Sequence, residues 1–270
     1  MDGMTVAATG LPRVPEAGQH AFRDALRMEW IKLGSLRSSV WALVGVVVGM
    51  IGIGVATMAN TKPPSAAKAA AFDPTNNVLA GIALGQLVVG AIGVLVVTGE
   101  YSSGSIRSTL AAVPNRRRLL AAKATVIGGI SLVVGEVITF VTFFAGRAAL
   151  SGSVPHPALG QPGVVRALLL SGLYLSMIAV IGVALGAMIR HTAAAVAAQV
   201  GLIFVVPAIL AGFTGTTVAK FLPSIIASSS LAVAKPDPDT LHPWVGFAVL
   251  WLYVAAALVL GDRVLTRRDA

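Results

Sequence analysis

The composition of this 270-residue chain is that of a membrane protein, because it leaves too few polar side chains to cover a soluble globule. Hydrophobic residues make up 56% of the chain and charged residues 11%, and the mean hydropathy is +0.85. The net charge of +9 does not indicate nucleic-acid binding, because most basic residues stand between apolar stretches. The absence of cysteine excludes disulfides, thiol nucleophiles and thiolate metal sites.

The chain begins with residues 1–20, which are rich in glycine and proline and lack the continuous apolar core of a secretory signal. We expect this stretch to be a disordered cytoplasmic tail that is not cleaved. The next residues carry apolar side chains at helical spacing, which predicts an amphipathic helix at the membrane interface. Glu29 falls near the apolar side, so it either marks the edge of the stripe or pairs with a basic group on a neighbouring element. The alternative to a functional helix is a basic anchor that only sets topology. The apolar positions are Phe22, Leu26, Trp30 and Leu33.

Six apolar runs follow, each close to the roughly 20 residues that a helix needs to cross about 30 Å of hydrocarbon. The breaks between them are rich in proline, and the weakest break, at residues 190–192, permits only a tight turn. The pattern predicts an all-α polytopic membrane protein with six transmembrane helices. The predicted runs cover residues 40–58, 78–98, 124–149, 168–189, 193–213 and 244–260.

The basic residues predict the orientation of the spans. Six spans place both termini on one side, and fourteen of the twenty Lys and Arg residues fall on that side. Because loops rich in Lys and Arg stay in the cytoplasm, we expect both termini to be cytoplasmic.

The segment at residues 99–123, between the second and third spans, is too long for a simple turn. Ile106, Leu110 and Val113 fall on one helical face, Pro114 ends that helix, and Asn115 can cap the next one. A short helix held between two spans is well placed to receive a push from a partner protein. The alternative is a positively charged stop signal, which the arginines at 116–118 alone would satisfy.

The same segment resembles the first cytoplasmic loop of permease subunits in the type-2, exporter-class branch of ATP-binding cassette (ABC) transporters. The pattern consists of Glu100, Gly104, Arg107, Leu110, Pro114, Arg116 and Lys123. Two further segments are similar to the same family, one in its N-terminal interfacial helix and one in its last outer loop. They are Glu29, Lys32, Leu33, Arg37 and Trp41 in the first, and Phe221, Leu222, Pro223 and Ser224 in the second.

The resemblance implies that residues 21–270 form one permease domain of a bacterial ABC exporter in the cytoplasmic membrane. It implies two partners, a separate ATPase subunit that binds ATP and Mg, and a second permease copy in a homo- or heterodimer. No Gly-x4-Gly-Lys-Ser/Thr motif occurs, so we expect no cofactor and no ATP hydrolysis in this chain. Many members carry a charged residue where Tyr101 stands here. The residues that the resemblance assigns to ATPase coupling are Glu100, Tyr101, Gly104, Ile106, Arg107, Leu110, Pro114 and Arg116, and those of the interfacial helix are Glu29, Trp30, Lys32 and Arg37.

Two further features have open interpretations. Residues 214–241 form a long outer connection with apolar residues at helical spacing, which is either a re-entrant segment or a helix on the lipid headgroups. Glu136 is a carboxylate near the middle of a span, where a charge costs roughly 2.5–3.5 kcal/mol. It could contact a cationic substrate, or it could form a structural tie to Gln86 or Gln199, which we favour.

The main alternative to an exporter permease is a proton-coupled secondary transporter that uses Glu136 and needs no ATPase. A membrane enzyme is disfavoured, because the four histidines are scattered over different loops and tails and build no metal or acid-base site. The substrate class stays open among drugs, peptides, lipids and glycan precursors.

Overall fold

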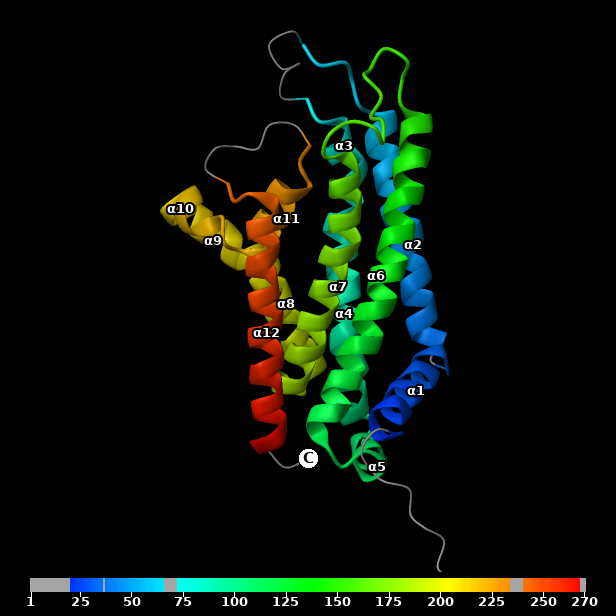
Figure 1. The fold of residues 1–270 in the computed structure, drawn as a ribbon, viewed down its shortest axis with the longest axis vertical. Coiled ribbons are helices and arrows are strands. Elements are labelled where there is room, and N and C mark those ends of the chain that lie inside the picture. The colour runs from blue at the N-terminus through cyan, green and yellow to red at the C-terminus, as the bar shows by residue number, and fades with distance from the viewer. Residues whose placement is uncertain (1–19, 36, 66–71, 234–239, 268–270) are drawn as a thin grey trace, which may run out of the picture.

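A computed structural model describes residues 20–35, 37–65, 72–233 and 240–267, and all regular structure in these ranges is helical. Six of its helices are long and apolar enough to cross a membrane, as predicted. They stand side by side as a bundle, and the C-terminal end of α12 and the short helix α5 lie at the same end (Figure 1). We call this end the α5 end. The predicted tail at residues 1–20 falls outside the described residues except for His20, which begins α1.

The six predicted spans are confirmed, and most of the helices extend beyond the apolar runs. The third helix begins at residue 116 rather than 124, because helical structure continues through polar residues outside the apolar zone. The second and fifth spans are each built from several consecutive helical segments. The spanning helices are α2 (Arg37–Ala59), α3 with η2 and α4 (Pro74–Val78, Leu79–Gly81, Ile82–Ser102), α6 (Arg116–Ala149), α7 (Val164–Ile189), α8 with η3 and α9 (Thr192–Val200, Gly201–Val205, Val206–Thr214), and α12 (Pro243–Arg267).

Helix α7 is the centre of the bundle. In its most apolar 18-residue stretch, 72% of the residues are buried. It packs against α4, α6 and α12. Glycines allow α4 and α7 to approach backbone to backbone: a Cβ placed on Gly93 would lie 2.1 Å from the carbonyl oxygen of Ala179. A Cβ on Gly182 would lie 2.4 Å from the carbonyl oxygen of Gly90. Small residues thus permit the close crossing of α4 and α7, as is usual in membrane bundles.

The predicted helix cap at Asn115 and the predicted tight turn at residues 190–192 are both present. Asn115 caps α6, and its side chain accepts a hydrogen bond from the backbone N–H of Arg118 at 3.2 Å. The connection between α7 and α8 is as tight as expected, with Arg190 in the left-handed region at φ 60°. His191 then caps α8.

The fifth span is irregular. A π-helical turn at η3 interrupts it, just before Pro207. Proline lacks an N–H group and clashes with the carbonyl four residues earlier, which accounts for a break in the α-helical ladder at this point. Beyond η3, α9 and the short α10 (Thr216–Ala219) lean away from the other helices (Figure 1).

Helix α11 (Pro223–Leu231) begins at the proline of the Leu-Pro-Ser element and packs against α7 and α12. Ile226 is fully buried and lies against Gly246 of α12. The backbone after α11 is fastened at both sides: Asp73 accepts the N–H of Val233 at 2.6 Å, and Arg166 donates to the carbonyl of Ala232 at 2.8 Å. Protein therefore covers α11 on the sides of α7 and α12, and the re-entrant and headgroup interpretations both stay predictions.

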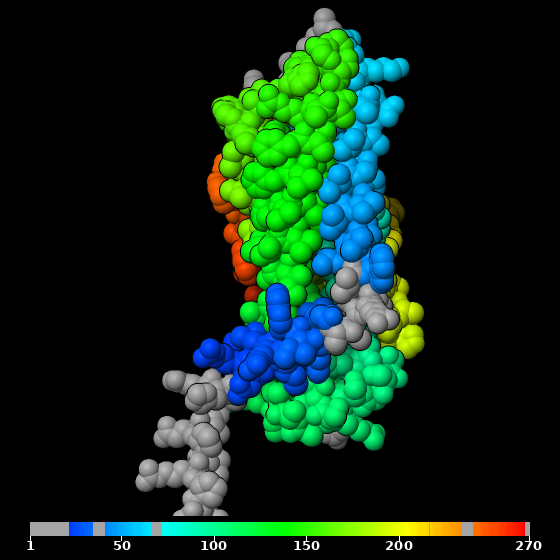
Figure 2. Space-filling model, turned by 90° about the vertical axis from the view of Figure 1, so that its right-hand side faces the viewer, coloured from blue at the N-terminus to red at the C-terminus, as the bar shows by residue number. Residues whose placement is uncertain are grey.

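Helix α1 (His20–Ser35) lies across the base of α2 and α6, just above α5 (Figure 2). A helix is therefore present at the residues where the interfacial helix was predicted. Trp30 and Ile31 are exposed on its outer side, with 62% and 58% of their surface accessible, as expected for a helix that contacts lipid. Its buried side carries Ala25 and, unexpectedly for an acidic residue, Glu29.

Candidate functional site

The chain reverses direction at the α5 end through a short turn and a separate helix. Helix α4 ends at Ser102, and α5 covers Ile106–Ala112. Gly104 has a φ of +72°, a left-handed conformation that costs glycine nothing. Glu100 therefore belongs to the end of α4, and the short helix predicted between the second and third spans begins only after the glycine turn.

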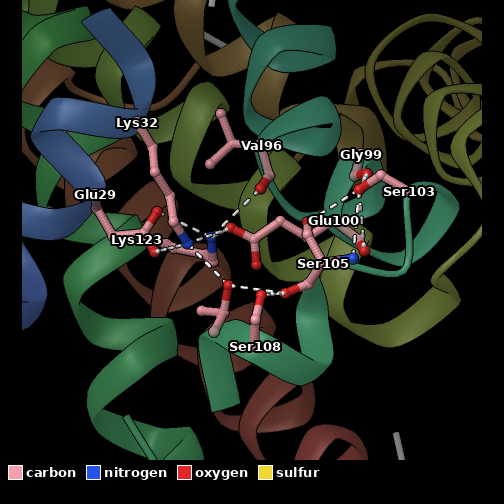
Figure 3. Close-up of polar contacts among 10 residues, drawn as sticks. Glu29, Lys32, Val96, Gly99, Glu100, Ser103, Ser105, Ser108 and Lys123 are labelled. Atoms are coloured by element: carbon pink, nitrogen blue, oxygen red, sulfur yellow. Dashed lines mark hydrogen bonds and ion pairs between the residues drawn. The ribbon is translucent and has the colours of Figure 1, made fainter. Parts of the chain in front are cut away.

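Four charged side chains from three helices meet behind this turn, and we call them the charge cluster: Glu29, Lys32, Glu100 and Lys123 (Figure 3). Lys123 of α6 donates to Glu29 Oε2 at 2.9 Å and to Glu100 Oε1 at 2.6 Å. Lys32 of α1 donates to the same Glu100 oxygen at 2.9 Å and lies 3.5 Å from Glu29 Oε1. The alternative in which Glu29 pairs with a basic neighbour is thus confirmed.

The cluster also holds α5. Lys32 Nζ donates to the hydroxyl of Thr109 at 2.9 Å, and Thr109 lies on the buried side of α5. Ile106, one turn earlier, is buried as well. Lys32 therefore connects α1 with α4 and α5. Lys123 connects α6 with α1 and α4.

Burial makes these contacts strong. The side chains of Glu29 and Lys123 are each 2% exposed, and that of Glu100 is 11% exposed. Removing one partner of a buried ion pair costs about 3–5 kcal/mol, because the other charge is left without compensation. The cluster therefore resists any movement that separates α1, α4 and α6.

The remaining residues assigned to ATPase coupling surround this cluster. The guanidinium of Arg190, at the α7–α8 turn, lies 5.0 Å from the centre of the Tyr101 ring, a cation–π contact. Arg116 donates to the carbonyl of Leu265 in α12 at 2.7 Å. Arg107 and Pro114 are exposed, and Leu110 is half-buried.

Arg107 thus points its charge to the surface rather than into the cluster. Of the residues assigned to the interfacial helix, Glu29 and Lys32 lie in the cluster and Trp30 lies on the exposed side of α1. The side chain of Arg37, the first residue of α2, falls outside the described part of the structure.

The predicted tie between Glu136 and a glutamine is absent. Gln86 is buried and accepts a hydrogen bond from Tyr174, while Gln199 donates to the carbonyl of Ile178 at 3.3 Å. Glu136 instead lies over Gly172 of α7, and its Oε2 accepts no hydrogen bond from the described residues. The prediction was wrong because helical spacing shows which residues share a face and does not show which partner that face meets.

Sequence reasoning did not find Thr109, Arg190 or Leu265 as members of this region. Thr109 sits one turn from Ile106 on the buried side of α5, a position that a polar residue rarely takes without a partner. That spacing was a usable signal. Arg190 and Leu265 come from distant parts of the chain, and no local sequence pattern indicates that they contact this region.

The comparison with known families decides what kind of protein carries this arrangement. A model of the ABC-2 family transporter protein matches residues 25–208, more than half of the chain. The chain belongs to the ABC-2 transporter family. No curated protein matches it. Membership indicates a multi-pass membrane protein that serves as the transmembrane component of an ABC transporter rather than as an enzyme, with an ATPase subunit as its general partner.

Proposed function

We propose that this ABC-2 family chain is the permease subunit of an ATP-driven exporter, and that a separate ATPase drives it through the segment at residues 99–123. The observation that carries the proposal is the buried charge cluster, because it links the short helix α5 to α1, α4 and α6. A surface loop that only reversed the chain would need no such connection.

The surface of α5 offers a place for a partner to press. Arg107 and Ala111 are exposed on the side that faces away from the bundle, whereas Ile106 and Thr109 face inward. A partner that moves when it binds and hydrolyses ATP would displace α5 from outside. Because separating the cluster costs several kcal/mol, we expect α1, α4 and α6 to follow α5 together.

The proposed orientation places the α5 end in the cytoplasm of a bacterial cell. The positive-inside rule supports it, since Arg107 lies in α5, the arginines at 116–118 open α6, and Arg263 lies near the end of α12, where Arg116 contacts Leu265. A cytoplasmic α5 is required if the ATPase subunit is to reach it.

The second permease copy belongs to the same proposal. The fifth span is 22% buried over its most apolar stretch, as little as α2. Its exposed apolar side chains include Val205, Ile209 and Phe213. A second copy packed along this span would cover them and would form the translocation path between the two chains.

Purification in mild detergent from native membranes tests the proposal. We expect a co-purifying ABC-type ATPase and ATP hydrolysis in the wild-type preparation, and loss of both in Arg107→Glu. Arg147→Glu is the matched control, because Arg147 is also exposed but lies near the far end of α6. A chain that purifies alone and inert would contradict the proposal and would favour the proton-coupled transporter that uses Glu136.

A further inference from the structure

The turn between α7 and α8 has an unusual residue at its centre. Among the described residues, Arg190 is the only one other than glycine in the left-handed region, with φ 60° and ψ 6°. A helix that ends in this conformation usually has glycine or asparagine there, because a Cβ makes the left-handed region unfavourable. Such strain persists only where the surrounding structure fixes it, and it clusters at functional positions. A glycine would make the same turn without strain, so the turn itself does not require arginine.

The side chain of Arg190 reaches back to the end of α4. Its guanidinium lies 5.0 Å from the centre of the Tyr101 ring, and Tyr101 directly follows Glu100 of the charge cluster. One turn earlier in α4, the hydroxyl of Thr98 accepts a hydrogen bond from Thr192 at 2.9 Å. Both contacts join the base of the fifth span to the last turns of α4.

The fifth span has a second attachment, deeper in the bundle. Gln199 is 3% exposed and donates to the carbonyl of Ile178 in α7 at 3.3 Å. Its amide fills a notch between two glycines: a Cβ on Gly90 of α4 would overlap the amide nitrogen, and a Cβ on Gly182 of α7 would lie 3.0 Å from the amide oxygen. Gln199 follows Thr192 by seven residues, about 10 Å along the helix axis. This attachment lies at the α4–α7 crossing, where the close backbones leave little room for movement.

Beyond Gln199 the fifth span makes few contacts with the other described helices. The π-helical turn η3 comes next, followed by α9, which packs chiefly against η3 and α10. Helices α9 and α10 lean away from the bundle (Figure 1). Phe213, near the end of α9, is 86% exposed. The span is therefore held at its base and at Gln199, whereas its far half stands apart.

From this arrangement we infer that the fifth span works as a lever and that Arg190 is the positioning residue at its driven end. The inference rests on the proposed function, in which α5 and the end of α4 move together. When the end of α4 moves, Tyr101 displaces Arg190 and the base of α8. The notch around Gln199 is the pivot, and α9 moves in the opposite direction. Tyr101, which the resemblance assigns to ATPase coupling, thus serves a contact within the chain.

Two distances, measured by pulsed electron paramagnetic resonance, test the lever. Because the chain has no cysteine, spin labels go only to introduced cysteines, before the labelled chain is assembled with its ATPase in nanodiscs. The exposed pair Phe213→Cys and Leu252→Cys reports α9 against α12, and the exposed pair Ser108→Cys and Arg263→Cys reports α5 against α12. Dilution with unlabelled chain keeps both labels in one copy. We expect both distances to change between the nucleotide-free state and a state trapped with ATP and vanadate.

Arg190→Gly separates the lever from a merely structural contact. Glycine adopts the left-handed conformation without strain, so its relief offsets the lost cation–π contact and the melting temperature should stay close to wild type. The ATPase should still co-purify and the α5 distance should still change, but the change in the α9 distance should be largely lost. Arg190→Lys keeps a cation over the ring and should restore it.

Tyr101→Leu keeps the charge of Arg190 and removes only its ring partner. The change in the α9 distance should be lost to the same extent, and combining Tyr101→Leu with Arg190→Gly should add nothing, because the two side chains act as one contact. Additive losses would contradict the assigned pairing.

The remaining outcomes separate this inference from the proposed function. An unchanged α9 response in Arg190→Gly would overturn the inference, and so would a wild-type chain in which only the α5 distance responds to ATP. Neither result would affect the proposed function. Absence of any ATP-dependent change at α5 in the wild-type chain would contradict the proposed function and the lever together.

Discussion

Replacing Lys123 with methionine removes one ammonium group from the charge cluster while it keeps much of the apolar stem of the side chain. Glu29 and Glu100 then lose their shortest contacts, at 2.9 Å and 2.6 Å. Because Lys123 is 2% exposed, solvent cannot replace it. Loss of one partner from a buried pair costs about 3–5 kcal/mol, and Lys32 still neighbours both carboxylates, so we expect a loss near 3 kcal/mol.

The free energy of unfolding in mixed micelles, measured by denaturant titration, gives this loss directly. Arg117→Met is the matched control, because Arg117 pairs with Asp262 at 3.2 Å but is 75% exposed, and exposed pairs contribute about 0–1 kcal/mol. The double variant Lys123→Met with Glu29→Gln removes the uncompensated charge and should be less destabilised than the sum of the two single variants by about 0.5–3 kcal/mol. Equal effects of Lys123→Met and Arg117→Met, or strict additivity in the double variant, would refute the reasoning.

Three further predictions concern the membrane-spanning part. Gly93→Ala should lower the thermal stability strongly, because the new Cβ would meet the backbone of α7, whereas Gly129→Ala, which meets nothing within 4 Å, should not; equal melting temperatures would contradict the assigned α4–α7 crossing. Tyr174→Phe should cost about 1–3 kcal/mol of unfolding free energy by leaving the buried Gln86 oxygen without its donor, and a neutral effect would show that another group replaces it. Glu136→Gln should change the unfolding free energy by less than about 0.5 kcal/mol, since no hydrogen bond from a described residue is lost, and a large loss in the same titration would reveal a partner.

The spans were predictable because lipid imposes a simple requirement on the sequence. A helix that crosses hydrocarbon needs about 20 apolar residues, and the chain shows this as six separate runs. The caps were predictable for a similar local reason: Asn115 follows Pro114 and can accept a backbone N–H only if a helix begins there. Such features depend on neighbours within a few residues.

The charge cluster was predictable only in part. Its four residues all belong to the segments that resemble the family, and Glu29 stood out as an acid on an apolar face. The pairing of Glu29 with Lys123 joins positions 94 residues apart and depends on how α1 crosses α6. Helical spacing does not give that crossing.

The tie from Glu136 failed for the same reason. The helical wheel places Glu136 on a face of α6 with other residues of that helix, but the rotation of α6 against α7 brings Gly172 to it rather than a glutamine. The glutamines find partners of their own in Tyr174 and the backbone of α7. A cavity of about 490 Å³ beside the cluster was beyond sequence reasoning as well, because residues of α1, α2, α4 and α5 line it.

Site-specific photo-cross-linking from α5 in native membranes tests the central claim most directly. A benzoylphenylalanine at position 107 should cross-link to an ABC-type ATPase, and the same group at position 147, near the far end of α6, should not. Absence of an ATPase adduct from position 107, or equal adducts from both positions, would contradict the proposal that α5 receives the force of ATP hydrolysis.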